Sequence, residues 1–181
     1  MKVIIYVEGP SDVAALNTLL RSLIDEAAQV GIEIRFIGRG GKSRLVGAVA
    51  LRALDIVRNA PQDHVFAVPD LYPRNVGVPH STCDELRNAL VHQFAQHCQR
   101  LQLDPTPLLP RFHVHCLKHD LEVLLLAAEG ALMAYLGSQS FAVAWRRPPE
   151  DQNFDRPPKR IVERLFSQHL RRDYVDTVSV Q

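Results

Sequence analysis

The feature that most constrains the fold is an apolar run near the N-terminus that ends abruptly at an acidic residue. Residues 3–7 are all β-branched or aromatic, a composition typical of a strand covered on both faces in a parallel sheet. Glu8, Gly9 and Pro10 end the run. Ligands of open α/β sheets bind at the carboxyl ends of the strands. The run therefore predicts an inner strand that presents Glu8 at the functional edge of a sheet.

The rest of the chain alternates strand-like and helix-like segments. Strand patterns cover residues 32–37, 64–68 and 112–117, and helical spacing covers residues 13–24, 45–57, 82–101 and 121–136. Helices placed singly between strands imply right-handed βαβ crossovers. The sequence thus predicts an α/β fold, a three-layer Rossmann-like domain with a mostly parallel sheet of about four strands flanked by helices.

Length and composition predict a single domain over residues 1–181. The chain has 181 residues and 46% hydrophobic content, enough for one continuous core without disulfides or a structural metal. Residues 139–158 contain two Pro-Pro pairs and many charges, which predicts an irregular surface excursion or a lid. Helical spacing resumes over residues 159–172, the predicted C-terminal helix.

Charge and cysteine content bear on compartment and partners. The net charge is +1, which neither requires nor excludes nucleic acid, so any basic surface must be local. Three cysteines, Cys83, Cys98 and Cys116, are widely spaced, which indicates a reducing compartment. The sequence shows no signal-peptide pattern and no long apolar span, so we expect a cytoplasmic protein.

A second acidic residue, Asp70, also follows an apolar run. If the strands before Glu8 and Asp70 are neighbours, both residues lie at the same sheet edge, because parallel strands share a direction. Adjacent strands are about 4.8 Å apart, close enough for two carboxylates to hold one hard cation. Two converging carboxylates without a metal would repel each other. The pattern therefore predicts a divalent-metal site.

A glycine-rich turn follows the second predicted strand, with the sequence Gly38-Arg39-Gly40-Gly41-Lys42-Ser43. It is not a Walker A loop, because Phe36 stands where that motif needs its first glycine. It also fails the dinucleotide fingerprint, because Ser43 occupies the place of the third glycine. Two interpretations remain. The turn is either a backbone nest that binds one phosphate beside Arg39, Lys42 and Arg44, or a solvated turn whose glycines only bend the chain.

Four histidine and cysteine side chains near the fourth predicted strand raise the question of zinc. They are His113, His115, Cys116 and His119. His113 and His115 would share one face of a strand and Cys116 the other, which disfavours a common metal and favours half-buried strand histidines. His119 is the one predicted to pair with a phosphate or an acid.

Trp145 and the Arg146-Arg147 pair lie within the proline-rich excursion. One interpretation is that they stack on and steer a nucleic acid. The other is an ordinary charged surface loop.

These motifs together resemble a known family. The strand that ends in Glu8-Gly9-Pro10-Ser11-Asp12, followed by a strand that ends in Asp70-Leu71-Tyr72, is similar to the Toprim fold of topoisomerases, primases and overcoming-lysogenization-defect-type nucleases. The likeness is closest to the Toprim-related bacterial family DUF4276. It extends to the turn Gly40-Gly41-Lys42, to the segment 119–125 in which Glu122 leads an apolar helix, and to Pro157-Pro158-Lys159-Arg160.

The resemblance implies a Toprim-like nuclease or nicking subunit that uses Mg²⁺ or Mn²⁺ to hydrolyse phosphodiesters. Glu8 would be the general acid/base or a metal ligand, and Asp70 would hold the metal against the phosphodiester. Asp12 and Glu122 would complete the metal shell, and Lys42 would join Glu8 and Asp70 as a catalytic residue. The phosphate-binding residues would be Gly9, Arg39, Gly40, Gly41, Lys42 and His119. Tyr72 stands where the family has a second acid, which predicts weak metal binding and a preference for Mn²⁺.

The resemblance also implies partners. Nucleic acid is the expected substrate, DNA in preference to RNA, together with a partner ATPase, a role in phage defence and a homodimer. Two other function classes remain. One is a noncatalytic Toprim-like subunit that binds an ATPase. The other is a phosphoacceptor receiver domain, which normally pairs two acids after the first strand and places a lysine after a fifth, a pattern that this sequence lacks.

Overall fold

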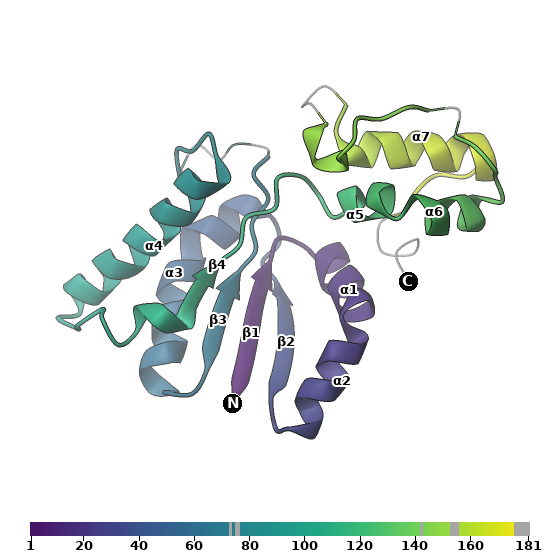
Figure 1. The fold of residues 1–181 in the computed structure, drawn as a ribbon. Coiled ribbons are helices and arrows are strands. Elements are labelled where there is room, and N and C mark those ends of the chain that lie inside the picture. The colour runs from purple at the N-terminus through teal and green to yellow at the C-terminus, as the bar shows by residue number, and fades with distance from the viewer. Residues whose placement is uncertain (73, 75–76, 142, 153–155, 176–181) are drawn as a thin grey trace. The chain divides into compact units, whose positions relative to one another are not determined.

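The computed structural model describes all of residues 1–181 except 73, 75–76, 142, 153–155 and 176–181. The chain divides into two compact units, residues 1–117 and residues 118–180. Each unit has a hydrophobic cluster of its own. Figure 1 shows the elements of both.

The first unit is built on a four-stranded parallel sheet. The strands are β1 (Lys2–Val7), β2 (Glu33–Gly38), β3 (His64–Ala67) and β4 (Phe112–Val114). Their order in the sheet is β2-β1-β3-β4, and every pair is parallel. The predicted α/β class, with a parallel sheet of four strands flanked by helices, is confirmed.

Helices α1 (Pro10–Leu19) and α2 (Arg21–Gln29) connect β1 to β2, and α3 (Lys42–Asn59) and α4 (Cys83–Arg100) precede β3 and β4. The sequence predicts one helix over residues 13–24, whereas the structure has two that meet at Leu20. Near this break the side chains of Asn17 and Thr18 donate to the carbonyls of Val13 and Ala14. Such bonds to the preceding turn bend helices.

The strand order creates a topological switch point between β1 and β3. The chain leaves β1 toward β2 on one side and returns to β3 on the other, so α1 and α2 lie along β2 while α3 and α4 lie at the other side of the sheet (Figure 1). Ligands of open α/β sheets bind in the crevice at such a point, outside the carboxyl ends of the strands. The residues after β1 and β3 are therefore the first place to look for a site.

The core of the first unit lies under α3 and α4. Val65 and Ala67 of β3 and Phe112 and Val114 of β4 are buried there. Between them, Phe66 stacks on His113 and His115, so both histidines share the opposite face, as the two-residue period predicts. His113 is half-buried there, whereas His115 is exposed.

The fourth strand ends earlier than the sequence predicts. β4 stops at Val114, and parallel pairing resumes as a single bridge between Asp70 and Leu117. Leu71 donates to the carbonyl of Leu117 at 2.6 Å, and Leu117 donates to that of Pro69 at 3.0 Å. Pro69 has no N–H to donate to a ladder, so the regular pairing breaks just before Asp70.

The second unit is a small helical assembly. It contains α5 (Glu122–Ala127), α6 (Glu129–Leu136), the short 3₁₀ helix η2 (Pro149–Asp151) and α7 (Pro158–Leu170). The single helix predicted over residues 121–136 is interrupted at Ala128. The buried hydrophobic cluster of the second unit consists of Leu126, Leu132, Leu136, Val143, Ile161, Val162, Leu165 and Phe166.

The predicted surface excursion, residues 139–158, includes four residues outside the described part of the chain. In its described part, Arg147 forms a two-pronged ion pair with Glu129 of α6, each N–O distance being 2.7 Å. Among the described residues, no helix is both long and apolar enough to cross a bilayer.

Candidate active site

The site begins with a direct contact between the two predicted acidic positions. The backbone N–H of Asp70 donates to Oε1 of Glu8 at 3.0 Å. Glu8 follows β1 and Asp70 follows β3, which are neighbouring parallel strands. The structure therefore brings the two predicted residues together at the switch point, as the hypothesis of a shared edge requires.

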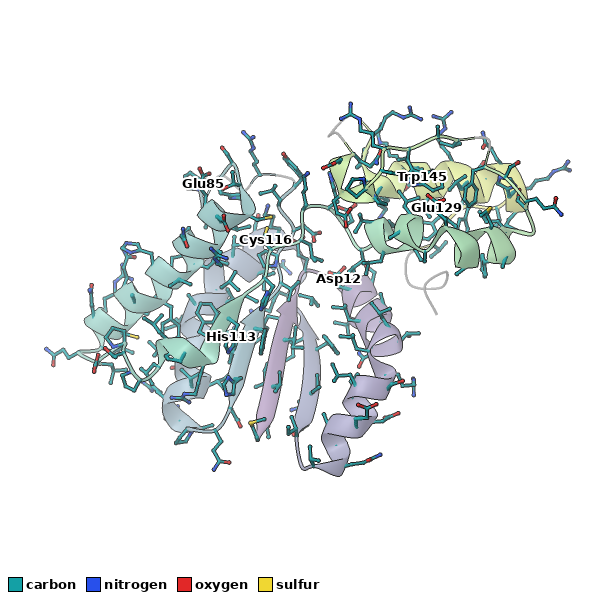
Figure 2. The ribbon with its side chains drawn as sticks, viewed as in Figure 1. Asp12, Glu85, His113, Cys116, Glu129 and Trp145 are labelled. Atoms are coloured by element: carbon teal, nitrogen blue, oxygen red, sulfur yellow. The ribbon has the colours of Figure 1, made fainter. Side chains whose placement is uncertain are left out.

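Asp12 lies in the first turn of α1, just beyond Glu8 in sequence (Figure 2). Its Oδ2 accepts a hydrogen bond from the N–H of Gly9 at 2.7 Å. This contact satisfies a backbone donor at the helix start and places a carboxylate where the helix dipole favours negative charge. Asp12 thus has a helix-capping role, and a carboxylate oxygen can accept such a bond and still bind a cation.

The glycine-rich turn lies directly against Glu8. Gly41 donates its N–H to the carbonyl of Glu8 at 2.7 Å, and Arg39 donates to the carbonyl of Val7 at 3.0 Å. Gly40 and Gly41 have φ values of +75° and +109°, a region that glycine occupies without strain. The turn is therefore shaped to fit the end of β1, and the N–H of Gly41 is already used by Glu8.

Lys42 points into the protein and not into solvent. The residue is only 7% exposed. Its ammonium donates to the carbonyl of Leu71 at 2.7 Å and lies 3.1 Å from Nε2 of His80. The turn after β2 is thereby tied to the segment after β3, so Lys42 joins the same edge as Glu8 and Asp70.

His80 is a member of this site that sequence reasoning missed. It is buried, and its Nδ1 contacts the carbonyl of Val78. Its Nε2 lies 3.1 Å from the ammonium of Lys42 and 3.2 Å from the carbonyl of Leu71. His80 is therefore in contact with both Lys42 and the segment after β3. No periodicity in the sequence marks it, because its contacts come from a loop.

The charges at this edge oppose one another. Burial lowers the pKa of Lys42, while the nearby groups of Glu8, Cys116, Asp70 and Cys83 act in the opposite direction. Two carboxylates and one ammonium leave a local net charge of −1 (−2 + 1) from these three groups. Lys42 accordingly relieves part of the repulsion between the acids, and the remaining charge still favours a cation.

Two of the predicted phosphate-binding side chains make contacts within the protein, and their phosphate-binding role stays a prediction. The guanidinium of Arg39 lies over the ring of Tyr6, 5.8 Å from its centroid. His119 belongs to the second unit, is buried, and has its Nε2 at 3.0 Å from the carbonyl of Gln152. Gly9, Gly40, Gly41 and Lys42 do lie together at the switch point.

Glu122, the fourth predicted metal ligand, is a buried residue at the start of α5 in the second unit. Its predicted contribution to the metal shell stays a prediction. Within the part of the chain that the structure describes, no three His, Cys, Asp or Glu side chains form a ready metal cluster. Mg²⁺ usually takes only one or two protein carboxylates and completes its shell with water and substrate phosphate. Glu8 and Asp70 fit that requirement.

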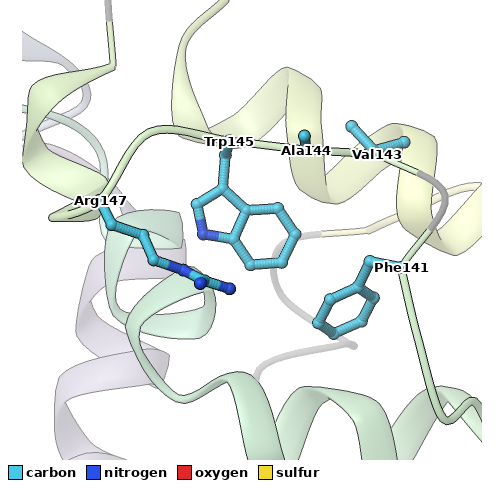
Figure 3. Close-up of a pocket in the computed structure, with 5 residues that line it drawn as sticks. All are labelled: Phe141, Val143, Ala144, Trp145 and Arg147. Atoms are coloured by element: carbon cyan, nitrogen blue, oxygen red, sulfur yellow. The ribbon is translucent and has the colours of Figure 1, made fainter.

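A separate pocket lies in the second unit, around the aromatic residues of the excursion. It has a volume of about 460 Å³ and is lined by Phe141, Val143, Ala144, Trp145 and Arg147 (Figure 3). The rings of Phe141 and Trp145 are 4.9 Å apart. The buried indole Nε1 of Trp145 has no hydrogen-bond partner among the described residues. The pocket thus combines two aromatic rings with an arginine whose guanidinium is paired with Glu129.

A protein-family model matches nearly the whole chain. The model of the family described as "Domain of unknown function (DUF4276)" matches residues 7–179. The chain belongs to the DUF4276 family. The match confirms the family that the sequence motifs resemble. No curated protein and no solved structure gives a match.

The DUF4276 match covers both units and includes every predicted site residue from Glu8 to Glu122. The switch-point site and the helical unit are therefore parts of one family domain in sequence.

Proposed function

We propose that this DUF4276 chain is a Toprim-related subunit that hydrolyses or nicks phosphodiesters with a divalent metal, Mg²⁺ or Mn²⁺. The observation that carries the proposal is the hydrogen bond from the Asp70 N–H to Glu8, which joins the acidic ends of two adjacent parallel strands. A topological switch point lined with acids and a buried lysine is the expected place for chemistry in such a sheet.

This geometry supports the following roles for the chain's own residues. Glu8 and Asp70 would hold the metal, with Asp12 close by at the start of α1. When bound, the metal neutralises charge on the phosphoryl oxygens. Glu8 would also move a proton to or from the attacking or leaving oxygen. Lys42, which contacts His80, would stabilise negative charge at the same edge.

Nucleic acid, and DNA in particular, is the proposed substrate. Support for a nucleic-acid partner comes from the pocket in the second unit, because bases stack on aromatic side chains such as Trp145. A partner ATPase and a role in phage defence remain part of this proposal on the strength of the family resemblance alone, as does a homodimer.

The decisive experiment measures Mn²⁺ binding by calorimetry on the wild type and on Glu8→Gln and Asp70→Asn. Glutamine at position 8 keeps an oxygen to accept from Asp70, so the fold should persist while binding weakens by roughly tenfold or more. Glu26→Gln and Asp25→Asn, exposed positions on α2, are matched controls and should bind as the wild type does. Lys42→Met should strengthen Mn²⁺ binding on the order of tenfold, because it removes a nearby positive charge.

Activity is read from metal-dependent nicking of supercoiled DNA, with and without the partner ATPase. Glu8→Gln and Asp70→Asn should abolish nicking, whereas the α2 controls should not. If the wild type bound no Mn²⁺ and showed no nicking in either condition, the enzyme hypothesis would be rejected in favour of the noncatalytic subunit. In that case the positive charge of Lys42 would offset the negative charges of Glu8 and Asp70.

A further inference from the structure

Two cysteines that the proposed function does not use lie next to each other at the edge of the switch-point site. Cys83 is the first residue of α4. Cys116, which is labelled in Figure 2, lies two residues beyond the end of β4. They are 33 positions apart in sequence (116 − 83), yet their side chains are hydrogen-bonded to each other. Both residues are only partly buried, and neither is in a disulfide in the structure.

The elements that hold the two sulfurs are well anchored. Thr82 caps α4, because its hydroxyl accepts from the N–H of Glu85 while the Glu85 carboxylate accepts from the N–H of Thr82. Beside Cys116, the backbone of Leu117 pairs with Pro69 and Leu71. The thiol of Cys116 also lies 3.5 Å from the carbonyl of Leu117. The contact between the sulfurs therefore joins two ordered segments.

The two thiols differ in chemical setting. Burial, followed by the contact with Cys83, raises the pKa of Cys116, which keeps its thiol protonated. Cys116 is accordingly the poorer nucleophile of the pair. Cys83 is therefore the group that attacks an oxidant, and Cys116 is the neighbour that resolves the product.

We propose that Cys83 and Cys116 are a modification site, a dithiol that peroxide converts into a reversible intramolecular disulfide beside Lys42. The Cys83 thiolate attacks one oxygen of hydrogen peroxide, and its O–O bond breaks to leave a sulfenic acid and hydroxide, which takes up a proton to become water. The Cys116 sulfur then displaces the sulfenic oxygen as a second water while its own proton is lost. Overall, two thiols and one peroxide give one disulfide and two waters, and a thiol reductant reverses the change.

The dithiol has a role separate from the proposed hydrolysis, because forming its disulfide needs neither metal nor nucleic acid. It is close to the switch-point site, because Lys42 donates to the carbonyl of Leu71, whose N–H donates to Leu117 beside Cys116, and because Lys42 also contacts His80, three residues before Cys83. The disulfide would tie the start of α4, just after His80, to the segment after β4. Oxidation would thereby add a covalent cross-link at the edge of the sheet where Lys42 contacts His80.

The test treats the reduced full-length protein with stoichiometric hydrogen peroxide and counts thiols, with peptide mapping to locate the bond. We expect free thiols to fall from three to one, with a loss of two hydrogen atoms in mass and a Cys83–Cys116 cross-linked peptide. Dithiothreitol should restore three thiols. The oxidised protein should also melt higher, by on the order of 5–10 °C, because the bond closes a long loop in the unfolded chain.

Cys98 provides the matched control. It is fully buried in the core, and it lies 15 residues (98 − 83) further along α4, about 22 Å from Cys83 at 1.5 Å per residue. Cys98→Ala should still form the disulfide, whereas Cys83→Ser and Cys116→Ser should not. Because mapping the wild type needs no variant, a misfolded serine variant would not affect the result. Three thiols that persist in the folded wild type, or a bond that forms only between molecules or through Cys98, would overturn the proposal.

Discussion

Glu8 shows how one residue can organise a site through its backbone and its side chain at once. Its carbonyl accepts from Gly41 after β2, and its carboxylate accepts from Asp70 after β3. The loops after three strands therefore meet at this residue. Lys42 adds a second link between two of these loops by reaching Leu71. A group so placed has little freedom, which is what a metal ligand or a proton-transfer residue requires.

At the same scale, the histidines on the half-buried face of the sheet predict a pH effect. Nδ1 of His64 lies 3.1 Å from Nε2 of His113, and the two rings are stacked. Burial, followed by the nearby His64 and His115, lowers the pKa of His113 from 6.5. Below pH 6.5 the unfolded chain therefore binds more protons at this residue than the folded chain, so its protonation favours unfolding as the pH falls.

We expect the wild type to lose stability between about pH 7.5 and about pH 5.5, in the range where histidines titrate. His113→Phe, which can keep the stack on Phe66, should reduce that loss by a few tenths to about 1 kcal/mol. Urea unfolding at both pH values measures it. His92→Gln, an exposed position on α4, should leave the pH dependence as it is. An equal loss in His113→Phe and the wild type would show that this pair does not couple folding to pH.

At the scale of elements, the end of β2 and the start of α1 meet closely. Gly38 is the last residue of β2, and a Cβ added there would lie 3.0 Å from the carbonyl oxygen and 3.1 Å from the carbonyl carbon of Gly9. These are backbone atoms that cannot turn aside as a side chain can. The close approach keeps the residues after β1 and β2 together, and with them Glu8 and the glycine-rich turn.

Gly38→Ala should therefore destabilise the protein by about 1–3 kcal/mol, the usual range for overpacking. Gly47→Ala is the contrasting variant. It lies inside α3, and a Cβ there meets nothing within 4 Å, so it should stabilise the protein by up to about 1 kcal/mol through helix propensity. Denaturant midpoints of the two variants and the wild type measure both effects. If Gly38→Ala proved as stable as the wild type, the close approach of Gly38 to Gly9 would not limit the size of the residue at position 38.

At the scale of the whole molecule, the hydrophobic interior is divided. The larger cluster consists of residues of the first unit only, and the second cluster of residues from α5 onward. A unit with its own core can fold by itself. The switch-point residues Glu8, Asp70, Lys42 and His80 all belong to the first unit.

We therefore expect residues 1–117, produced alone, to show a cooperative thermal transition and a circular dichroism spectrum with both helix and strand. If Glu122 supplies a metal ligand, this fragment should bind Mn²⁺ more weakly than the full chain, by roughly tenfold or more, and about as weakly as full-length Glu122→Gln. Calorimetry on the three proteins measures the comparison. Equal binding in all three would remove Glu122 from the proposed metal shell, and a fragment without a transition would show that the first unit depends on the second.

Several features of this protein follow from local sequence alone. The apolar run before Glu8 specifies β1, because five consecutive β-branched or aromatic residues favour an extended strand. The run does not determine its burial, since only Tyr6 and Val7 of β1 are buried. The acids Glu8 and Asp70 are recognisable as strand ends for the same reason. Alternation of strand and helix patterns predicts the parallel sheet, since the connections between parallel strands obey a strict handedness.

Only the tertiary structure decides which of these ends meet. The order β2-β1-β3-β4 brings Asp70 to Glu8, and no local pattern encodes the order of strands in a sheet. The contacts of Lys42 with His80 and of Cys83 with Cys116 join loops that are 38 and 33 positions apart. Such contacts depend on where the chain returns after a crossover, whereas periodicity reports only which face of its own element a residue occupies.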